Sequence, residues 1–596
     1  MLAAMPLPPT TAPPGDETTV RGRTDACPGA LRLHPADDGA LARVRVPAGL
    51  LTARQALVLS LAAEELGDGR LDLTSRGNLQ LRGLDAGCAA GLAERLRTAG
   101  LLPSDRHDRV RNVVASPLSG LDGAGYADVS AWARELDALL CDDEPEGSGF
   151  AELAQLSGRF LFALDDGRGD VAALGADVTL IAAPDGEALL RLGSAGGHEP
   201  AAPGTRPDPG ECAADARGAP GAPGVADSCG AADTPGPADA RGTTAVPARR
   251  DGRAEPDGDT PDPARPLAHP GPPHGPGNGG PEASSRPGGG TVGAELRVRA
   301  EDAPRAAAVA AVAFLDAVRA SGTRIWRVRE LPARHAVTAD GLARRLAEAG
   351  VRFAGLGPVS GVAGAQTSAT DAAGVHSGSE RPAVAGPTYG PPPATGRGVA
   401  GTRGPGSQEP PAIGLVAGPD GRCAVSIAAP LGRLSAAQWR LLAKVASQGG
   451  SGELRVTPWR GVVLPGFSPD GAEAALRELA DAGLVTAPDS PWLGVGACTG
   501  RPGCAKSLAD VRAEAGRAVA GGASGNGLPG RPRGRLPAYF SGCERRCGHP
   551  GGRWVDVLAT GDGYQVTVRG ATGAARGVDV TAEQVAGAVA AARGTT

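Results

Sequence analysis

Apolar and polar side chains follow the same order of patterns in two distant stretches of the chain. In each stretch a short apolar run predicts a strand, and a Thr or Ser N-cap then opens a run with apolar residues at helical spacing. Two more strand-like runs and a second helical run follow, separated by breaks that contain glycine. This strand–helix–strand–strand–helix order predicts a ferredoxin-like unit, an antiparallel sheet with helices on one face. The caps are Thr52 and Ser435, the strands 41–48, 70–75, 78–83, 423–430, 453–458 and 461–466, and the second helices 89–100 and 471–483.

The two stretches also match residue by residue. Residues 47–83 align without a gap with residues 430–466, and each residue of the second stretch carries a number 383 higher. Chance similarity between Gly-, Ala- and Leu-rich segments is the alternative, and the long ungapped match argues against it. We therefore predict an α+β protein with two ferredoxin-like half-domains in a pseudo-two-fold arrangement. Identical pairs are Pro47/Pro430, Gly49/Gly432, Leu51/Leu434, Gln55/Gln438, Gly67/Gly450, Gly69/Gly452, Leu71/Leu454, Thr74/Thr457, Leu81/Leu464 and Gly83/Gly466.

Other segments predict further ordered structure and three regions without any. Strand-like alternation with an Asp-Asp-Gly turn runs through 156–183, and 303–322 predicts a helix. Residues 195–293 and 362–411 are rich in Pro, Gly, Ala, Asp and Arg without periodic order. They lack the large apolar side chains whose burial offsets the entropy of ordering a backbone. We predict that both are long disordered insertions and that 1–22 is a disordered N-terminus.

Composition narrows the class of partner. The net charge of −5 and the pI near 6.0 give no sign of the basic surface of a nucleic-acid-binding protein. No run of about 18 or more apolar residues predicts a membrane span. The N-terminal sequence also lacks the basic segment and apolar core that are typical of a signal peptide. We expect a cytoplasmic protein that contacts neither nucleic acid nor a membrane.

Four of the ten cysteines gather near the C-terminal end, as Cys498-x5-Cys504 and Cys543-x3-Cys547. In a long chain without a secretory signal they do not indicate a disulfide framework. Four thiolates suit zinc or an iron–sulfur cluster, but structural zinc usually takes cysteines two to four residues apart, so the wider first interval favours a 4Fe–4S cluster. Glycines in both loops would let backbone N–H groups approach the sulfur atoms, at Gly496, Gly500, Gly503, Gly542 and Gly548.

This cysteine spacing, at the end of a duplicated chain, resembles the cluster signature of the siroheme nitrite and sulfite reductases and their relatives. LTSRGNLQLRG at 73–83 resembles that family's TTRQ-type motif, and RNVV at 111–114 resembles its other arginine motif. The resemblance implies two further domains that bind a tetrapyrrole and the cluster. The predicted domains are the half-domains 23–102 and 412–488, a reductase-type domain made of 103–194 and 294–361, and a cluster-binding domain 489–596.

Within that superfamily, six segments resemble the precorrin-3B synthase branch. The resemblance implies hydroxylation of precorrin-3A at C20 with O2, closure of a γ-lactone from a ring A acetate, and reducing equivalents that come ultimately from NADH. The alternative is a siroheme-dependent nitrite or sulfite reductase, in which the tetrapyrrole is a bound cofactor and not the substrate. The segments are 26–49, 73–84, 111–122, 456–466, 496–510 and 541–550.

Arginines of these motifs are the candidates for holding tetrapyrrole carboxylates, because a guanidinium binds a carboxylate through two hydrogen bonds. Arg76 and Arg111 match the family's tetrapyrrole-binding arginines, and Arg82 and Arg460 stand in the same strand motifs. A solvated surface arginine is the alternative for each of them.

The segment LSGRFLF at 156–162 departs from the reductases, which carry two lysines here that contact the small anion. Arg159 stands at the first lysine position and Leu161 at the second. The loss of one cation disfavours a small oxyanion, whereas Arg159 still suits a carboxylate of a larger substrate. The second cysteine pair departs too, because CERRC at 543–547 stands where reductases typically have CPNxC.

Oxygen chemistry needs an activating centre, and the resemblance implies a mononuclear non-haem iron beside the cluster. Such a site usually takes two histidines and one carboxylate. No motif of that kind exists around His34, His107, His335 or His549, the histidines outside the predicted insertions. His549, two residues after Cys547, is the candidate catalytic histidine, and a structural role is the alternative.

The electron donor is expected to be a separate protein. GLGPVSG at 355–361 and GVGACTG at 494–500 lack the glycine spacing of a dinucleotide-binding fingerprint. A ferredoxin, a flavodoxin or an NADH-linked reductase would supply the electrons. A zinc-binding scaffold without catalytic activity remains a further alternative, which explains the cysteines but not the duplicated arginine strands.

Overall fold

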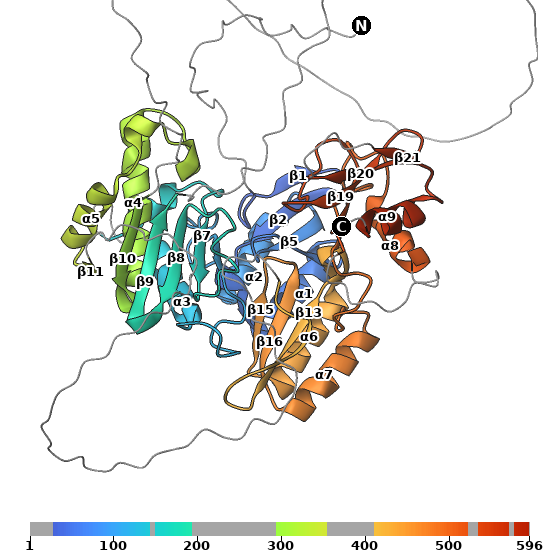
Figure 1. Ribbon diagram of the computed structural model, residues 1–596, viewed down its shortest axis with the longest axis horizontal. Coiled ribbons are helices and arrows are strands. Elements are labelled where there is room, and N and C mark those ends of the chain that lie inside the picture. The colour runs from blue at the N-terminus through green and yellow to red at the C-terminus, as the bar shows by residue number, and fades with distance from the viewer. Residues whose placement is uncertain are drawn as a thin grey trace, which may run out of the picture. The chain divides into compact units, whose positions relative to one another are not determined.

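The computed structural model describes residues 28–142, 149–193, 294–354, 410–522, 535–570 and 577–594 (Figure 1). All of them belong to one unit of the chain, Met1–Pro203 with Gly290–Thr596. The predicted disordered segments 1–22 and 195–293 lie outside the described residues, as does 362–411 apart from its last two residues. In the described part, no helix is long and apolar enough to cross a membrane.

Both predicted half-domains have the expected strand–helix–strand–strand–helix order, in antiparallel sheets. The first sheet has the strand order β1-β2-β5-β4-β14 and the second β12-β13-β16-β15-β3. Figure 1 shows α6 and α7 together on one face of the second sheet, as predicted. The first half-domain contains β1 (His34–Ala36), β2 (Gly39–Val44), α1 (Ala53–Leu66), β4 (Arg70–Leu73), β5 (Leu79–Leu84) and α2 (Ala89–Thr98), and the second contains β12 (Gly414–Ala417), β13 (Cys423–Ala428), α6 (Ala436–Gly449), β15 (Glu453–Val456), β16 (Gly461–Phe467) and α7 (Pro469–Asp481).

Both predicted N-caps are present, and each is part of a capping box. The Thr52 hydroxyl accepts from the Gln55 backbone N–H, while the Gln55 side chain accepts from the Thr52 N–H. Ser435 and Gln438 repeat the arrangement at the start of α6. Each box satisfies two backbone donors that the first helical turn leaves without partners.

The half-domains exchange short edge strands. β3 (Leu50–Thr52) of the first half pairs with β15 of the second, and β14 (Arg433–Ser435) of the second pairs with β4 of the first. Side chains from both halves, among them Leu59 of α1 and Trp439 of α6, form one buried core. The exchange is reciprocal, as a pseudo-two-fold arrangement of duplicated units requires.

The two remaining sheets share one topology. In each, the first three strands are parallel and the later ones antiparallel. The segments predicted within 156–183 and 303–322 are strands and a helix, as expected. The first sheet contains β6 (Val113–Ala115), β7 (Phe162–Asp165), β8 (Val178–Ala183), β9 (Glu187–Leu192), β10 (Ala294–Arg299) and β11 (Phe353–Ala354), with α3 (Val129–Leu140), α4 (Ala303–Ser321) and α5 (Ala339–Glu348), and the second contains β17 (Val495–Ala497), β18 (Ala538–Ser541), β19 (Trp554–Ala559), β20 (Tyr564–Arg569) and β21 (Val578–Val580), with α8 (Val511–Gly522) and α9 (Val585–Arg593).

Candidate functional site

The two cysteine pairs lie in loops at the same edge of one sheet. Cys498 directly follows β17, and Cys543 comes two residues after β18. β17 and β18 are parallel neighbours, so their carboxyl ends, and the loops that follow them, meet. The Gly542 N–H donates to Cys498 Sγ at 3.2 Å, and the Leu508 N–H donates to the Gly542 carbonyl at 2.8 Å. Residues far apart in the sequence are thus joined beside the first cysteine.

The Cys547 thiol lies within electrostatic range of the other three cysteines. Partial burial raises the pKa of the Cys547 thiol, and the neighbouring Cys543, Cys498 and Cys504 sulfurs raise it further, while Arg545 lowers it. None of the described cysteines forms a disulfide. The donor set therefore has the chemistry that an iron–sulfur cluster needs: four soft thiol ligands and a backbone N–H directed at one of the sulfurs.

A ready-made site for a single ion is absent from the described part of the chain, where no three Cys, His, Asp or Glu side chains are grouped closely enough to hold one. The four cysteines, with one thiolate for each iron, would hold a 4Fe–4S cluster, and the non-haem iron expected beside it stays a prediction.

Side chains of β18 and β19 bind the Cys543–Cys547 loop. Arg546 has a left-handed backbone, with φ +44°, and its Nε donates to Asp556 Oδ2 at 2.6 Å. The Tyr539 hydroxyl donates to the Cys547 carbonyl at 2.6 Å. Burial raises the pKa of Tyr539 to about 12, against the effect of Arg460, so the hydroxyl keeps its proton for that bond. Sequence reasoning missed Tyr539 and Asp556, because their partners are set by strand register.

His549, the predicted catalytic histidine, is exposed and stacks on Trp554 with ring centroids 5.0 Å apart and planes 10° from parallel. Its Nδ1 lies 2.8 Å from the Pro550 carbonyl, which requires a proton on Nδ1. The stack and the hydrogen bond fix the orientation of the ring. Its catalytic role stays a prediction.

Arg76 lies in the turn between β4 and β5, where its Nη1 donates to the Gly158 carbonyl at 3.5 Å. Arg45 Nη2 approaches the same carbonyl at 3.5 Å, and Asn112 Nδ2 donates to it at 2.7 Å. Gly158 directly precedes Arg159 in the LSGRF segment, residues 156–160. Arg45 and Arg76 therefore contact the same segment that contains Arg159. The sequence analysis did not select Arg45, although this residue lies in the strand predicted at 41–48.

Arg159 is exposed, and its guanidinium carbon lies 4.4 Å from the centroid of the Trp326 ring. A guanidinium over an indole face is a favourable cation–π pair that leaves its N–H edges open to hydrogen-bond partners. Leu161, two residues on, is only 4% exposed and packs in an apolar cluster with Ala163 and Val171. The second cationic position of the reductases is therefore part of the core here.

Arg82 and Arg111 are both buried and form ion pairs with acids of the protein. Arg82 forms two hydrogen bonds with Asp38, and Arg111 forms two with Asp137. Burial opposes the charge of Arg111, but the hydrogen bonds and charge of Asp137 outweigh it and raise the pKa above its ordinary value. In this arrangement both guanidinium groups are paired with acids of the protein, and their contact with a tetrapyrrole stays a prediction.

Arg460 lies beside the second cysteine pair. It has φ +60° in the turn after β15, and its Nη2 approaches the Gly548 carbonyl at 3.5 Å. The preceding residue, Trp459, packs against the apolar cluster that contains Leu161. This one turn therefore contacts both the LSGRF region and the residue that follows Cys547.

Two cavities occupy duplicated positions, neither lined by Arg76, Arg159 or Arg460. The larger, of about 1140 Å³, is lined by Arg70, Ser435, Gln438 and the Thr499–Gly503 loop among others. The smaller, of about 200 Å³, is lined by Glu453, Thr52, Gln55 and Arg111 among others. The first three of these are the repeat equivalents of Arg70, Ser435 and Gln438. The larger cavity adjoins the Cys498–Cys504 loop, and its lining contains arginines and aspartates in near balance.

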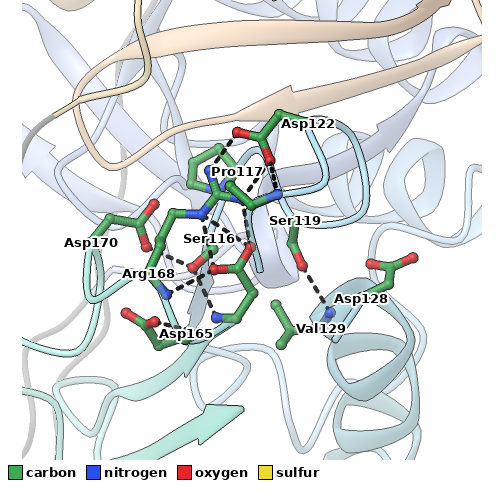
Figure 2. A network of polar contacts seen from close by, with 12 residues as sticks. Ser116, Pro117, Ser119, Asp122, Asp128, Val129, Asp165, Arg168 and Asp170 are labelled. Carbon is green, nitrogen blue, oxygen red and sulfur yellow. Dashed lines mark hydrogen bonds and ion pairs between the residues drawn. The ribbon is translucent and has the colours of Figure 1, made fainter. Parts of the chain in front are cut away.

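The first of the two related sheets carries an ionic network where the second carries cysteines. Loops after β6 and β7 are the topological equivalents of the loops after β17 and β18. Figure 2 shows Arg168 between Asp122 and the Asp165–Asp170 loop. Arg168 also binds Asp166, and the Ser116 hydroxyl donates to Asp170 at 2.6 Å. A buried ion-pair network thus joins the two loops in this domain.

Comparison with known proteins identifies the duplicated units. The family described as "Nitrite/Sulfite reductase ferredoxin-like half domain" matches residues 34–99 and 417–482. A ferredoxin–nitrite reductase of Synechococcus elongatus is 37% identical over 131 residues, 22% of this chain and 25% of the relative. A precorrin-3B synthase of a Sinorhizobium species is 36% identical over 127 residues, 21% of this chain and 27% of the relative. The aligned stretches thus span about a quarter of each relative.

A solved structure extends the likeness of fold beyond the half-domains. The structure of the Mycobacterium tuberculosis NirA protein matches with a TM-score of 0.51 over 92% of this chain and 79% of that chain, at 17% identity. The two family matches coincide with β1 to α2 and with β12 to α7. The chain thus contains two copies of the nitrite/sulfite reductase ferredoxin-like half domain, within a fold similar to that of the NirA protein.

Proposed function

We propose that this protein is an iron–sulfur monooxygenase of the precorrin-3B synthase type, which hydroxylates precorrin-3A at C20 with O2 and forms a γ-lactone. The observation that carries the proposal is the LSGRF segment. Where the reductases are expected to hold a small anion between two cations, Leu161 is buried among apolar side chains and only Arg159 is cationic. A single exposed guanidinium suits one carboxylate of a large polyanion better than it suits nitrite or sulfite.

The substrate would be held by arginines through its carboxylates. Arg76, Arg45 and Arg159 meet at the Gly158 region, and Arg460 lies beside Gly548 in the cysteine loop. Trp459, next to Arg460, packs against the apolar cluster that contains Leu161, and this contact supports one binding region for both groups of arginines. Several cations around one region suit a tetrapyrrole with several carboxylates.

The four cysteine side chains would hold the 4Fe–4S cluster, which supplies one-electron transfer when bound. Hydroxylation incorporates one atom of O2 at C20 and releases the other as water, and it consumes two electrons and two protons. The electrons would come from a ferredoxin, a flavodoxin or an NADH-linked reductase. His549 is the proposed catalytic histidine, because it lies two residues after Cys547 with its ring fixed by Trp554.

A siroheme-dependent nitrite or sulfite reductase is the second candidate. The 37% identity to a cyanobacterial ferredoxin–nitrite reductase is close to the 36% identity to a precorrin-3B synthase, and it favours this candidate equally at the level of the half-domains. In that case the same arginines would hold siroheme as a resident cofactor, and the substrate would be a small oxyanion.

One experiment separates the candidates. Protein purified without oxygen is analysed for iron, sulfide and siroheme, and is then supplied with precorrin-3A, a reductase system and isotopically labelled O2. We expect iron and sulfide without siroheme absorbance, and one labelled oxygen atom in the tetrapyrrole product. Siroheme absorbance together with reduction of nitrite or sulfite, and no labelled product, would establish the second candidate.

A further inference from the structure

We infer that Arg82 and Asp38, assisted by Asp37, are positioning residues for the cluster ligand Cys504. They belong to the first half-domain, yet they hold the peptide groups on both sides of this cysteine in the cluster domain. The inference rests on the proposed cluster and adds the device that keeps one of its ligands in place.

The carbonyl before Cys504 is held by Arg82. Arg82 lies on β5 with its side chain 5% exposed, and its Nη2 donates to the Gly503 carbonyl at 2.9 Å. Its Nε and Nη2 also donate to the two carboxylate oxygens of Asp38, at 2.9 and 2.7 Å. Because the carboxylate fixes the guanidinium through two bonds, the third bond has a defined direction.

The N–H after Cys504 is held by the adjacent acid. The Ala505 N–H donates to Asp37 Oδ2 at 2.5 Å. Asp37 and Asp38 form the two-residue turn between β1 and β2, whose register is fixed by the Ala36–Gly39 pair. This one short hairpin therefore contacts the cysteine loop directly through Asp37 and orients Arg82 through Asp38.

Gly503 shows how closely the hairpin approaches the loop. A Cβ built on Gly503 would lie 2.6 Å from Asp38 Oδ2 and 2.7 Å from Thr499 Cγ2. Any side chain here would push the loop away from Asp38. The steric fit and the hydrogen bonds are independent observations, and both tie Cys504 to the half-domain.

This role differs from the contact with a tetrapyrrole that the sequence predicted for Arg82. A residue that binds substrate changes the KM for the tetrapyrrole and leaves the cluster intact. A positioning residue changes the cluster even when no substrate is present. Groups that orient metal ligands typically change metal affinity about 10- to 100-fold when they are removed.

The test compares two variants that break matched ion pairs. In the full-length reconstituted protein, Asp38→Asn removes the partner of Arg82, and Asp137→Asn removes the partner of Arg111. The two arginines have the same 5% exposure, and each also donates to a backbone carbonyl, Gly503 or Leu101. Only the first pair touches the cysteine loop. The measurement is the rate at which a chelator removes iron, with the electron paramagnetic resonance spectrum of the reduced cluster.

We expect Asp38→Asn to speed iron loss about 10- to 100-fold and to alter the spectrum, with Asp137→Asn close to wild type. Asp37→Ala, at an exposed position, should speed iron loss several-fold without lowering the unfolding temperature. Equal effects of Asp38→Asn and Asp137→Asn, or wild-type iron retention in both Asp38→Asn and Asp37→Ala, would overturn the inference while leaving the proposed function standing. A wild-type protein that binds no cluster would overturn both.

Discussion

Arg546 and Asp556 join the second cysteine loop to the sheet beneath it, through a hydrogen bond of 2.6 Å from Nε to Oδ2. Arg569 donates to the same oxygen at 2.5 Å, and Asp556 is 1% exposed. This buried carboxylate gives both guanidinium groups a shared negative partner. It also anchors Arg546, whose left-handed backbone is unfavourable for a residue with a side chain.

Replacing Asp556 with Asn should destabilise this domain, because it removes the negative charge that both arginines share. We expect a loss of about 2 kcal/mol in the free energy of unfolding, the scale of hydrogen bonds to charged groups. Denaturant unfolding of the apoprotein measures it. Asp579→Asn, at an exposed position of β21 in the same domain, should stay within about 0.5 kcal/mol of wild type. Equal stability of the two variants would contradict the anchoring role.

Each of the four cluster cysteines should be required for the iron–sulfur absorbance. Serine at position 498, 504, 543 or 547 replaces a soft thiolate by a hydroxyl, so we expect each substitution to bleach the visible absorbance and abolish turnover. Cys423→Ser is the control, because Cys423 is buried in the second half-domain, outside the cysteine loops. Unchanged absorbance in two of the four serine variants would refute the ligand assignment.

Substitution of Arg76 or Arg159 by Ala should weaken binding of the tetrapyrrole without loss of the cluster. One charge-assisted bond contributes about 1.5–3 kcal/mol, which corresponds to a rise in KM of about 10- to 100-fold. Steady-state kinetics with precorrin-3A, together with the absorbance of the cluster, measure both properties. The control is Arg97→Ala, since Arg97 forms a surface pair with Asp105 away from the cysteine loops. A normal KM in both arginine variants would remove this region from the substrate site.

The protonation of Asp170 predicts how the stability of the protein depends on pH. Burial raises its pKa from an ordinary 3.8 to about 6, against the hydrogen bond from Ser116. The folded protein therefore binds this proton more tightly than the unfolded chain. Stability from this group is complete below the unfolded pKa and is lost as pH rises through the folded pKa. The stability contributed by the Asp170 proton is therefore lost between pH 3.8 and about 6. At neutral pH the full free-energy cost of the buried carboxylate applies.

Asp170→Asn should therefore stabilise the protein at neutral pH, by about 3 kcal/mol near pH 7.5 and by about half of that near pH 5. The shift in unfolding temperature at the two pH values measures this difference. Asp165→Asn is the opposite control, since the Asp165 carboxylate accepts four backbone N–H bonds from the same loop. It should destabilise the protein at both values. A destabilised Asp170→Asn variant near pH 7.5 would contradict the account of this site.

Local signals in the sequence predicted much of the fold. Thr52 with Gln55 and Ser435 with Gln438 are three residues apart, and each pair forms its capping box. The half-domains, their helices on one face and the long helix near 303–322 followed from periodicity. The exchange of β3 and β14 between halves was not predictable, because pairing between positions as distant as Leu51 and Leu454 depends on tertiary packing and leaves no local pattern.

The sequence predicted which residue types form the candidate site, but it did not predict which residues their side chains bind. Cysteine spacing pointed to the two loops, and the structure brings them to one sheet edge. By contrast, Arg82 and Arg111 carried the right motif, yet their partners Asp38 and Asp137 could not be read from it. Each acid lies tens of residues from its arginine in the sequence. Arg45, Tyr539 and Asp556 were missed for the same reason.

The most direct test of the account is the iron and acid-labile sulfide content of wild-type protein reconstituted without oxygen. Four cysteines around one cubane predict about four irons and four sulfides per chain, with a reduced-state electron paramagnetic resonance signal of a 4Fe–4S cluster. Zinc in place of iron, or no sulfide after reconstitution, would contradict it.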